Sequence, residues 1–598
     1  MPAKPSHLIL NSPFEEPRLH WEFVRETLGF RIAEGRRKAG YVMATPGAKG
    51  FEDPGQFNEI ALVNRIRPRV KAWSEAGWPG VTGMTRRLLE HWNDATTRDG
   101  RRFFFCQLEA VETLIWLQEA DPSERVGLVI SGDGGNWERL CCKMATGTGK
   151  TLVMAMVLAW QFLNRASYPH DSRFAKYALI VAPGITVRSR LEVLVPDSEG
   201  NYYDLFQVVP GPLVDMLRQG KVIIRNWQAM AWDSPDKIAK RRSVDKRGAK
   251  SDEVYCREVL GELAAHKNLL VINDEAHHAW RIPAEFKGRR EDKDLFAEAT
   301  VWVGGLDRIH RTRGIARCYD FSATPFAPSG KQSYEEALFG WIVSDFGLND
   351  AIESGLVKTP RVVVRDDSGQ FSQDYKSRLF HIYADPEVNA DITRAAEPQE
   401  PLPSLVTNAY YLLGKDWLET KNLWEEAGAP TPPVMITVAN RTETAARIKF
   451  TFDRKKILIE ELCDPERTLH IDSKVLREAE AAEDIEIPED KTADDGDDEV
   501  VATPKLTKKQ QAQLLRRTVD SVGQPGKEGE RIQNVISVGM LSEGWDAKTV
   551  THIMGLRAFT SQLLCEQVVG RGLRRTSYEL NKEGHFDAEY VNLSLIHI

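Results

Sequence analysis

The segment "MATGTGKT", residues 144–151, has the pattern with the clearest chemistry. Its glycines let backbone amides wrap around phosphate oxygens, Lys150 can reach the β and γ phosphates of a nucleotide, and the Thr151 hydroxyl can ligate Mg²⁺. Met144 stands where the general pattern GxxxxGK[ST] has its first glycine. The predicted phosphate-binding residues are Thr146, Gly147, Thr148, Gly149, Lys150 and Thr151.

A second polar constellation, "LLVINDEAHHAW" at 269–280, ends an apolar run with two carboxylates. Asp274 would lie near the magnesium, and Glu275 would orient and deprotonate an attacking water. Adjacent histidines without a third ligand are not typical of a metal site. We therefore interpret His277 as a polar link near the carboxylates and leave His278 unassigned.

The third candidate is "QVVGRGLRR", residues 567–575, where Arg571 and Arg574 are three residues apart. Residues at this spacing share one face of a helix, and two guanidinium groups there could brace a transferring phosphoryl group. An arginine supplied in this way changes the rate by about 10³ to 10⁵. Both arginines are predicted to be catalytic.

Strand and helix patterns alternate around these segments. A short strand at 139–144 precedes the glycine loop, a helix follows at 150–166, and further strands are expected at 177–183, 221–227, 268–274 and 315–325. A second series has strands at 432–440, 467–473, 531–539 and 550–556 and a helix at 561–575. This alternation predicts an α/β fold of two tandem units with parallel sheets, whose ligands lie at the carboxyl ends of the strands.

The predicted domains are an N-terminal extension at 1–100, a first ATPase domain at 101–345, a connecting segment at 346–400 and a second domain at 401–598. Residues 334–364 are interpreted as a bridge between the two units, with Trp341 and Phe346 in the core. Residues 478–499 are expected to form a solvated acidic insert. We also expect that the second domain is truncated at its C-terminus.

The net charge of −8 would argue against a nucleic-acid partner if the acidic residues were spread evenly along the chain, but they are not. The acidic insert carries −11, which leaves about +3 for the rest. Basic clusters lie at 65–73 and 237–250, and each could follow a phosphate backbone or form a solvated surface. The seven cysteines contain no CxxC pair, and no apolar run is long enough to cross a membrane, so a cytoplasmic location is expected.

In the order in which they occur, these motifs resemble those of superfamily 2 helicases of the DEAD/DEAH-box kind, and among them the restriction subunit of type III restriction endonucleases. The resemblance rests on "MATGTGKT", "DEAHH", "FSATP" at 321–325, "GMLSEGWDAKTV" at 539–550 and "QVVGRGLRR". It implies two RecA-like motor domains, ATP and Mg²⁺ as cofactors, and Thr151 and Asp274 as the residues that hold the metal.

The resemblance also implies roles for residues outside the glycine loop. Ser322 and Thr324 would couple the nucleotide state to domain movement, together with His277. Gly544 and Asp546 would lie at the face between the domains, and Gln567, with the two arginines, would reach across to the nucleotide. Gln107, in "FFFCQLEAVET", is similar to the glutamine that reads adenine in these helicases, although it could also be a polar position on an amphipathic helix.

The function implied is ATP hydrolysis that drives movement along DNA, most consistent with duplex DNA, beside a methyltransferase subunit and without a membrane. The alternative is a stand-alone DNA or RNA helicase. No nuclease motif was found, so cleavage is not predicted for this chain.

Overall fold

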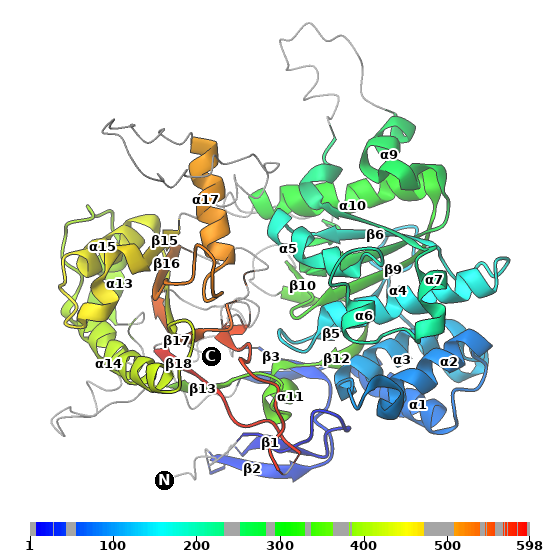
Figure 1. The fold of residues 1–598 in the computed structure, drawn as a ribbon, viewed down its shortest axis with the longest axis horizontal. Helices are drawn as coiled ribbons and strands as arrows, with labels where there is room; N and C mark the ends of the chain where they lie inside the picture. Colours follow the sequence, from blue (N-terminus) through cyan, green and yellow to red (C-terminus); the bar gives the residue numbers. More distant parts are fainter. Residues whose placement is uncertain are drawn as a thin grey trace, which may run out of the picture. The chain divides into compact units, whose positions relative to one another are not determined.

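The computed structural model describes residues 8–24, 26–27, 29–43, 55–232, 251–282, 293–328, 336–362, 382, 385–471, 508–538, 545, 547–556, 566, 569–570, 572–582 and 584–594. The chain forms two compact units (Figure 1). Unit 1 comprises Met1–Val357, Ser561–Glu566 and Ser577–Ala588, and unit 2 comprises Lys358–Thr560, Gln567–Thr576 and Glu589–Ile598.

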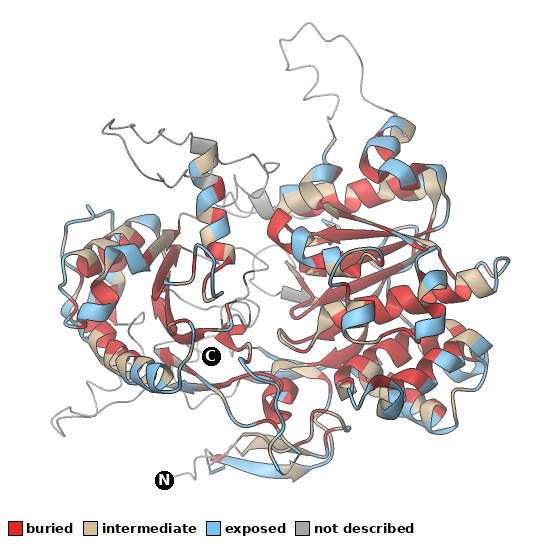
Figure 2. Cartoon of the chain, viewed as in Figure 1, coloured by how far each residue is buried: buried red, intermediate tan, exposed pale blue. Residues whose placement is uncertain are grey.

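Unit 1 is built on a six-stranded parallel sheet in the order β12-β5-β9-β8-β6-β7. Its strands are β5 (Leu140–Met144), β6 (Tyr177–Ala182), β7 (Lys221–Asn226), β8 (Leu269–Asp274), β9 (Ile315–Ser322) and β12 (Ile342–Phe346). Most of their residues are buried, as expected for strands covered on both faces (Figure 2). Because the strands are parallel, β5, β8 and β9 end at the same edge.

Helices cover both faces of this sheet. The helices of unit 1 are α1 (Ala61–Glu75), α2 (Gly83–Asn93), α3 (Phe105–Glu119), α4 (Lys150–Ser167), α5 (Ile185–Arg190), α6 (Tyr202–Leu205), α7 (Val214–Leu217), α9 (Asp252–Leu260), α10 (Lys293–Arg313) and α11 (Leu348–Glu353). Tyr319 of β9 packs near Trp160 of α4, with ring centroids 6.4 Å apart. The preceding residue, Cys318, belongs instead to the core formed by α9 and α10. Successive residues of β9 therefore pack into different hydrophobic layers on the two faces of the sheet.

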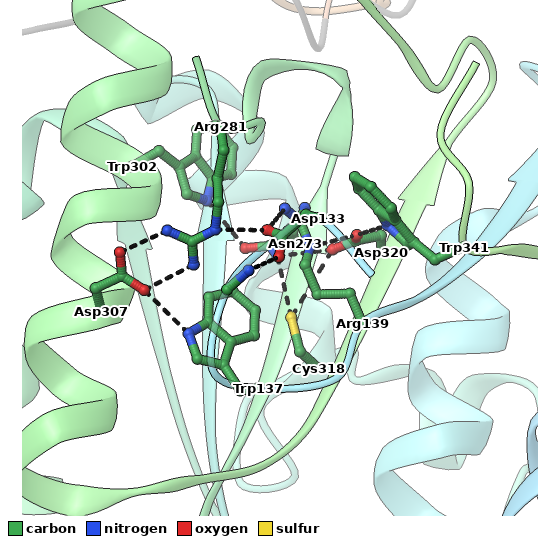
Figure 3. Close-up of polar contacts among 11 residues, drawn as sticks. Asp133, Trp137, Arg139, Asn273, Arg281, Trp302, Asp307, Cys318, Asp320 and Trp341 are labelled. Atoms are coloured by element: carbon green, nitrogen blue, oxygen red, sulfur yellow. Dashed lines mark hydrogen bonds and ion pairs between the residues drawn. The ribbon is translucent and has the colours of Figure 1, made fainter. Parts of the chain in front are cut away.

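A buried polar network links β8 and β9 to the residues directly before β5 and β12 (Figure 3). Asp320 of β9 accepts hydrogen bonds from Arg139 Nε at 2.8 Å, Trp341 Nε1 at 2.7 Å and Asn273 Nδ2 at 2.7 Å. Trp302 of α10 donates to Asn273 Oδ1 at 2.9 Å. The network fixes β8 and α10 against β9, one residue before the acidic pair.

The N-terminal extension adds two small antiparallel sheets to unit 1: β1 (Leu19–Val24) with β2 (Gly29–Glu34), and β3 (Gly40–Met43) with β4 (Gln56–Glu59). The preceding segment is attached where Phe105 N donates to the Pro13 carbonyl at 2.9 Å and Asn11 N donates to Glu353 O at 3.0 Å. The strands β10 (Phe326–Pro328) and β11 (Glu336–Leu338) form a third antiparallel pair.

The basic cluster at 65–73 lies on α1, and its cations bind groups of the protein itself. Arg67 Nη2 donates to the Asp345 carbonyl at 2.6 Å, and Arg69 Nη1 donates to the Glu124 carbonyl at 2.8 Å. Lys71 pairs with Glu16 at 2.6 Å. These bonds hold α1 in place, and contact of this cluster with a phosphate backbone remains a prediction. The other basic cluster, at 237–250, and the predicted acidic insert lie outside the described residues.

Unit 2 has a second six-stranded parallel sheet, in the order β13-β18-β17-β14-β16-β15. Its strands are β13 (Thr359–Val362), β14 (Val434–Ala439), β15 (Thr468–Ile471), β16 (Asn534–Val538), β17 (Val550–Leu556) and β18 (Tyr590–Ser594), and its helices are α13 (Pro386–Thr393), α14 (Ser404–Glu426), α15 (Thr442–Asp453) and α17 (Lys508–Asp520). Tyr410 of α14 and Phe452 of α15 pack with Met435, Ile536 and Met554 of the sheet in one core.

The six described cysteines are all buried, free thiols: Cys106, Cys141, Cys142, Cys256, Cys318 and Cys463. Burial raises the pKa of each of these thiols. In the described part of the chain, no helix combines the length and apolar composition needed to cross a membrane.

The predicted fold class, α/β with two tandem parallel-sheet units and an N-terminal extension, is confirmed. Segment 334–364 contains the passage from unit 1 to unit 2, between Val357 and Lys358, in line with the bridge expected from its sequence. Its apolar run forms β12, which pairs with β5 in the first sheet, and β13 near its end joins the second sheet. Trp341 and Phe346 are buried, as predicted. The predicted domain boundaries themselves remain predictions.

We predict that Asp320→Asn destabilises unit 1 by about 3 kcal/mol, because the fully buried Arg139 cation would lose one of its two carboxylates and keep only Asp133, at 3.0 Å. Urea denaturation measures the change. The control is Glu22→Gln, which removes the exposed Glu22–Arg31 pair and should cost less than about 1 kcal/mol. Equal losses in the two variants would contradict the importance of this buried pair.

Candidate nucleotide-binding site

The glycine loop joins β5 to α4 in a conformation that requires glycine at two positions. Gly147 and Gly149 have φ values of +86° and +87°. A Cβ on Gly149 would lie 2.2 Å from Gln107 Nε2, and one on Gly147 would lie 3.0 Å from a methyl group of Val357. Thr148 is fully buried, and its hydroxyl donates to the Ala145 carbonyl at 2.7 Å. The loop is thus preformed around the start of α4.

Gln107 of α3 supports this loop directly. Its Nε2 donates to the Thr148 carbonyl at 3.1 Å, and its Oε1 accepts a hydrogen bond from Phe104 N at 3.0 Å. Both ends of the buried amide are therefore bonded within unit 1, at the loop and at the first turn of α3. This places Gln107 at the site, although the predicted reading of adenine remains a prediction.

The acidic pair follows β8 at the same sheet edge. Glu275 has a left-handed backbone, with φ 48° and ψ 52°, a conformation uncommon outside glycine and frequent at functional sites. Its N–H donates to Asp274 Oδ1 at 3.0 Å, and its carboxylate lies 3.5 Å from Lys150 Nζ. The two predicted motifs, far apart in sequence, therefore meet at one place.

Asp274 carries a perturbed carboxyl group. Burial and the neighbouring Glu275 carboxylate raise the pKa of Asp274 to about 7, against the opposing effects of Lys150 and Arg190. A carboxyl group held near neutrality at a cleft edge is typical of functional sites. A divalent cation there would restore the carboxylate form.

His277 links the acidic pair to the next strand. Its Nδ1 lies 2.9 Å from Ser322 Oγ and 3.6 Å from a Glu275 carboxylate oxygen. Ser322 Oγ also accepts a hydrogen bond from Thr324 N at 3.1 Å. These contacts join β8 and β9 beside the site, so the polar link predicted for His277 has a structural counterpart.

His278, which the sequence left unassigned, points to α10. Its ring is nearly parallel to that of Trp302, at 6.3 Å between centroids, and its Nδ1 lies 3.3 Å from Glu298. It packs the acidic segment onto α10.

The described residues fit a magnesium-bound triphosphate. The first N–H groups of an α-helix have no intrahelical partner, and α4 begins at Lys150 beside the two glycines. The Thr324 hydroxyl is buried and has no hydrogen-bond partner within the described part of the chain. Lys150 supplies a cation, and Thr151 and Asp274 supply the oxygen ligands that Mg²⁺ prefers.

Four predicted residues of the second unit lie outside the described residues: Gly544, Asp546, Gln567 and Arg571. Arg574 is described and belongs to unit 2. The structure thus gathers the candidates of unit 1, including Gln107, around one loop, whereas the roles predicted for the second-unit residues remain predictions.

Sequence reasoning missed the residues that support this site. Asn273 and Asp320 are fully buried polar residues within apolar strands, next to the acidic pair and to Ser322 respectively. A polar side chain inside an otherwise apolar strand was the available signal, because a buried polar group needs partners. Their partners, which include Arg139, come from distant parts of the chain and left no local pattern.

A parallel sheet in which a strand leads through a glycine loop into a helix, with an acidic pair two strands away, is typical of a P-loop nucleotide-binding module. Residues 102–301 match the family model described as type III restriction enzyme, res subunit. This segment is therefore similar to that family, and the resemblance drawn from the motifs is confirmed.

Solved structures with similar folds include LlaBIII, an ATP-dependent type ISP restriction-modification enzyme bound to DNA (15% identity, TM-score 0.37, covering 83% of this chain and 28% of that one). A fragment assigned as an HsdR subunit of a type I restriction enzyme from Vibrio vulnificus YJ016 has 14% identity and a TM-score of 0.39, over 98% of this chain and 88% of that one. Mss116p, bound to single-stranded RNA and AMP-PNP, has 11% identity and a TM-score of 0.33, over 88% and 74%. The chain thus spans 28% of the length of the type ISP enzyme. No curated protein sequence matches this chain.

We predict that the affinity for Mg·ADP falls as the pH drops below 7, by up to about tenfold per unit. The free Asp274 holds a proton up to about pH 7, and that proton must leave before the carboxylate can ligate Mg²⁺. Titration calorimetry from pH 5.5 to 8.5 measures the slope. Asp274→Asn is the control, because it retains the nucleotide's own titration and loses that of residue 274. Identical slopes in the two proteins would contradict the prediction.

We predict that Gln107→Ala weakens binding of ATP and GTP equally, by about 5- to 50-fold, because the lost amide supports the Thr148 carbonyl whatever the base. Competition with a fluorescent nucleotide measures both affinities. A loss confined to ATP would instead support the reading of adenine by this side chain.

Proposed function

We propose that the chain is the ATP-dependent translocase motor of a type III-like restriction endonuclease, which hydrolyses ATP to move along DNA. The observation that carries the proposal is the convergence of the glycine loop and the acidic pair, with Lys150 Nζ 3.5 Å from Glu275. The match of residues 102–301 to the res-subunit family supports the class of motor.

In this proposal unit 1 binds Mg·ATP and activates the attacking water. The loop N–H groups and Lys150 bind the triphosphate of ATP, and Thr151 and Asp274 hold Mg²⁺, which supplies charge neutralisation when bound. Glu275 releases Lys150 to the phosphates and accepts a proton from the attacking water at its carboxylate. The loss of the γ phosphate would change the contacts of Glu275 and of the neighbouring His277. This change would reach the end of β9, because Ser322 is hydrogen-bonded to both His277 and Thr324.

Unit 2 supplies Gln567, Arg571 and Arg574, which would stabilise the charge of the transferring phosphoryl group, while Gly544 and Asp546 complete the site. A contribution of about 10³ to 10⁵ in rate makes hydrolysis depend on the approach of these arginines. The cycle of approach and release would shift the grip on a polynucleotide backbone.

The proposed partners are duplex DNA and a methyltransferase subunit, in the cytoplasm. DNA cleavage is not assigned to this chain. The second candidate is a stand-alone DNA or RNA helicase. Mss116p, one of the similar solved structures, is bound to single-stranded RNA.

We predict that duplex DNA stimulates phosphate release more than single-stranded DNA or RNA does, and that Lys150→Ala lowers the stimulated rate at least about 100-fold, because the γ phosphate loses its cation. Phosphate release is compared side by side with each polynucleotide and without any. Lys267→Ala, at an exposed position before β8, is the control and should retain the full rate.

Stimulation by RNA together with strand displacement would favour the second candidate. Undiminished turnover by Lys150→Ala would contradict both candidates, since each depends on the same loop.

A further inference from the structure

Lys358, the first residue of unit 2, is almost completely buried, with 1% of its surface exposed. Burial lowers the pKa of Lys358 to about 8, so the side chain is mostly protonated at neutral pH. A buried ammonium is costly unless its donors are satisfied. An apolar side chain would fill the same space without this cost, which points to a specific use of the charge.

The ammonium is bound by two backbone carbonyls. Nζ donates to Lys548 O at 2.6 Å and to Val550 O at 2.8 Å. Both acceptors lie at the end of the segment 539–550, which contains the predicted site residues Gly544 and Asp546. Lys358 thereby ties the end of this segment, where β17 starts, to the start of β13.

The backbone of the same residue holds the arginine segment. Lys358 N donates to the Leu573 carbonyl at 2.7 Å, directly before Arg574. Gly572 is packed so closely that an added Cβ would lie 2.8 Å from Ile553 of β17. The chain before Arg574 is therefore held against the sheet.

The chain after Arg574 is held by Glu589. Its carboxylate lies 3.3 Å from Arg575 Nη2 and accepts hydrogen bonds from Thr576 N and Oγ1 at 2.9 and 2.8 Å. The Glu589 carbonyl also accepts a hydrogen bond from Thr359 N at 2.7 Å. Residues 358–359 are thus bonded directly to the chain before Arg574 and, through Glu589, to the chain after it.

We propose that Lys358 is a positioning residue for Arg574: it holds the end of segment 539–550 and the arginine segment in one fixed arrangement at the edge of the second sheet. Glu589 completes this anchor on the other side of the arginine. The inference rests on the proposed role of Arg574 in ATP hydrolysis and deepens it. Neither Lys358 nor Glu589 needs to touch the nucleotide.

The test is a double-mutant cycle in the full chain, with ATP hydrolysis measured in the presence of the most stimulating polynucleotide. Lys358→Met should lower kcat about 10- to 100-fold, because the two carbonyls lose a charged donor. The KM for ATP and the affinity for Mg·ADP should change less than about threefold. In the Arg574→Ala background, Lys358→Met should cause almost no further loss. Glu589→Gln should behave in the same way and serves as a second variant if Lys358→Met fails to fold.

The matched control is Tyr410→Phe, which removes the buried hydrogen bond from Tyr410 to Thr437 in the same unit. It should leave kcat unchanged. Full activity of Lys358→Met and Glu589→Gln beside an inactive Arg574→Ala overturns this inference alone. Losses that add to that of Arg574→Ala also overturn it, since they would indicate a general structural effect. Full activity of Arg574→Ala overturns both the inference and the proposed role of the arginine.

Discussion

The carboxylate of Asp320 is the buried charge on which the first unit depends. It lies at the centre of the sheet without exposure to solvent, and Arg139, Asn273 and Trp341 satisfy it. Because these partners lie in β8 and directly before β5 and β12, only one register of these strands against β9 satisfies them all. That register brings Lys150 and Glu275 to the same sheet edge.

The chemistry of the first unit could be predicted from its sequence because phosphate binding uses backbone amides in a short continuous loop. Local spacing alone indicates the function of the glycines, of Lys150 and of the carboxylates. The positions of most parallel strands could also be predicted, because these strands are apolar runs in the sequence. Within the segment that connects the units, the pairing of β12 with β5 was not predicted, because an edge strand added late in the chain has no local pattern that distinguishes it from a connection. The bonds of Arg67 to distant carbonyls were hidden for the same reason.

The residues that support the site differ in burial and in bonding from the residues that form it. Lys150 and Thr151, which are proposed for chemistry, are partly exposed, whereas Gln107 and Lys358, which support such residues, are buried and bonded to backbone groups. Backbone acceptors impose no sequence on the partner, so no pair of residue types reveals such contacts. Three-dimensional information is needed to find them.

The burial of the thiols has a practical consequence. A deprotonated, accessible sulfur is the form that maleimides and related dyes attack, and the six described cysteines offer neither property. With Cys565 replaced by serine, a pair of surface cysteines introduced one in each unit would be the preferred sites of labelling. Single-molecule fluorescence could then follow the separation of the units through a turnover while the native sulfurs stay in place.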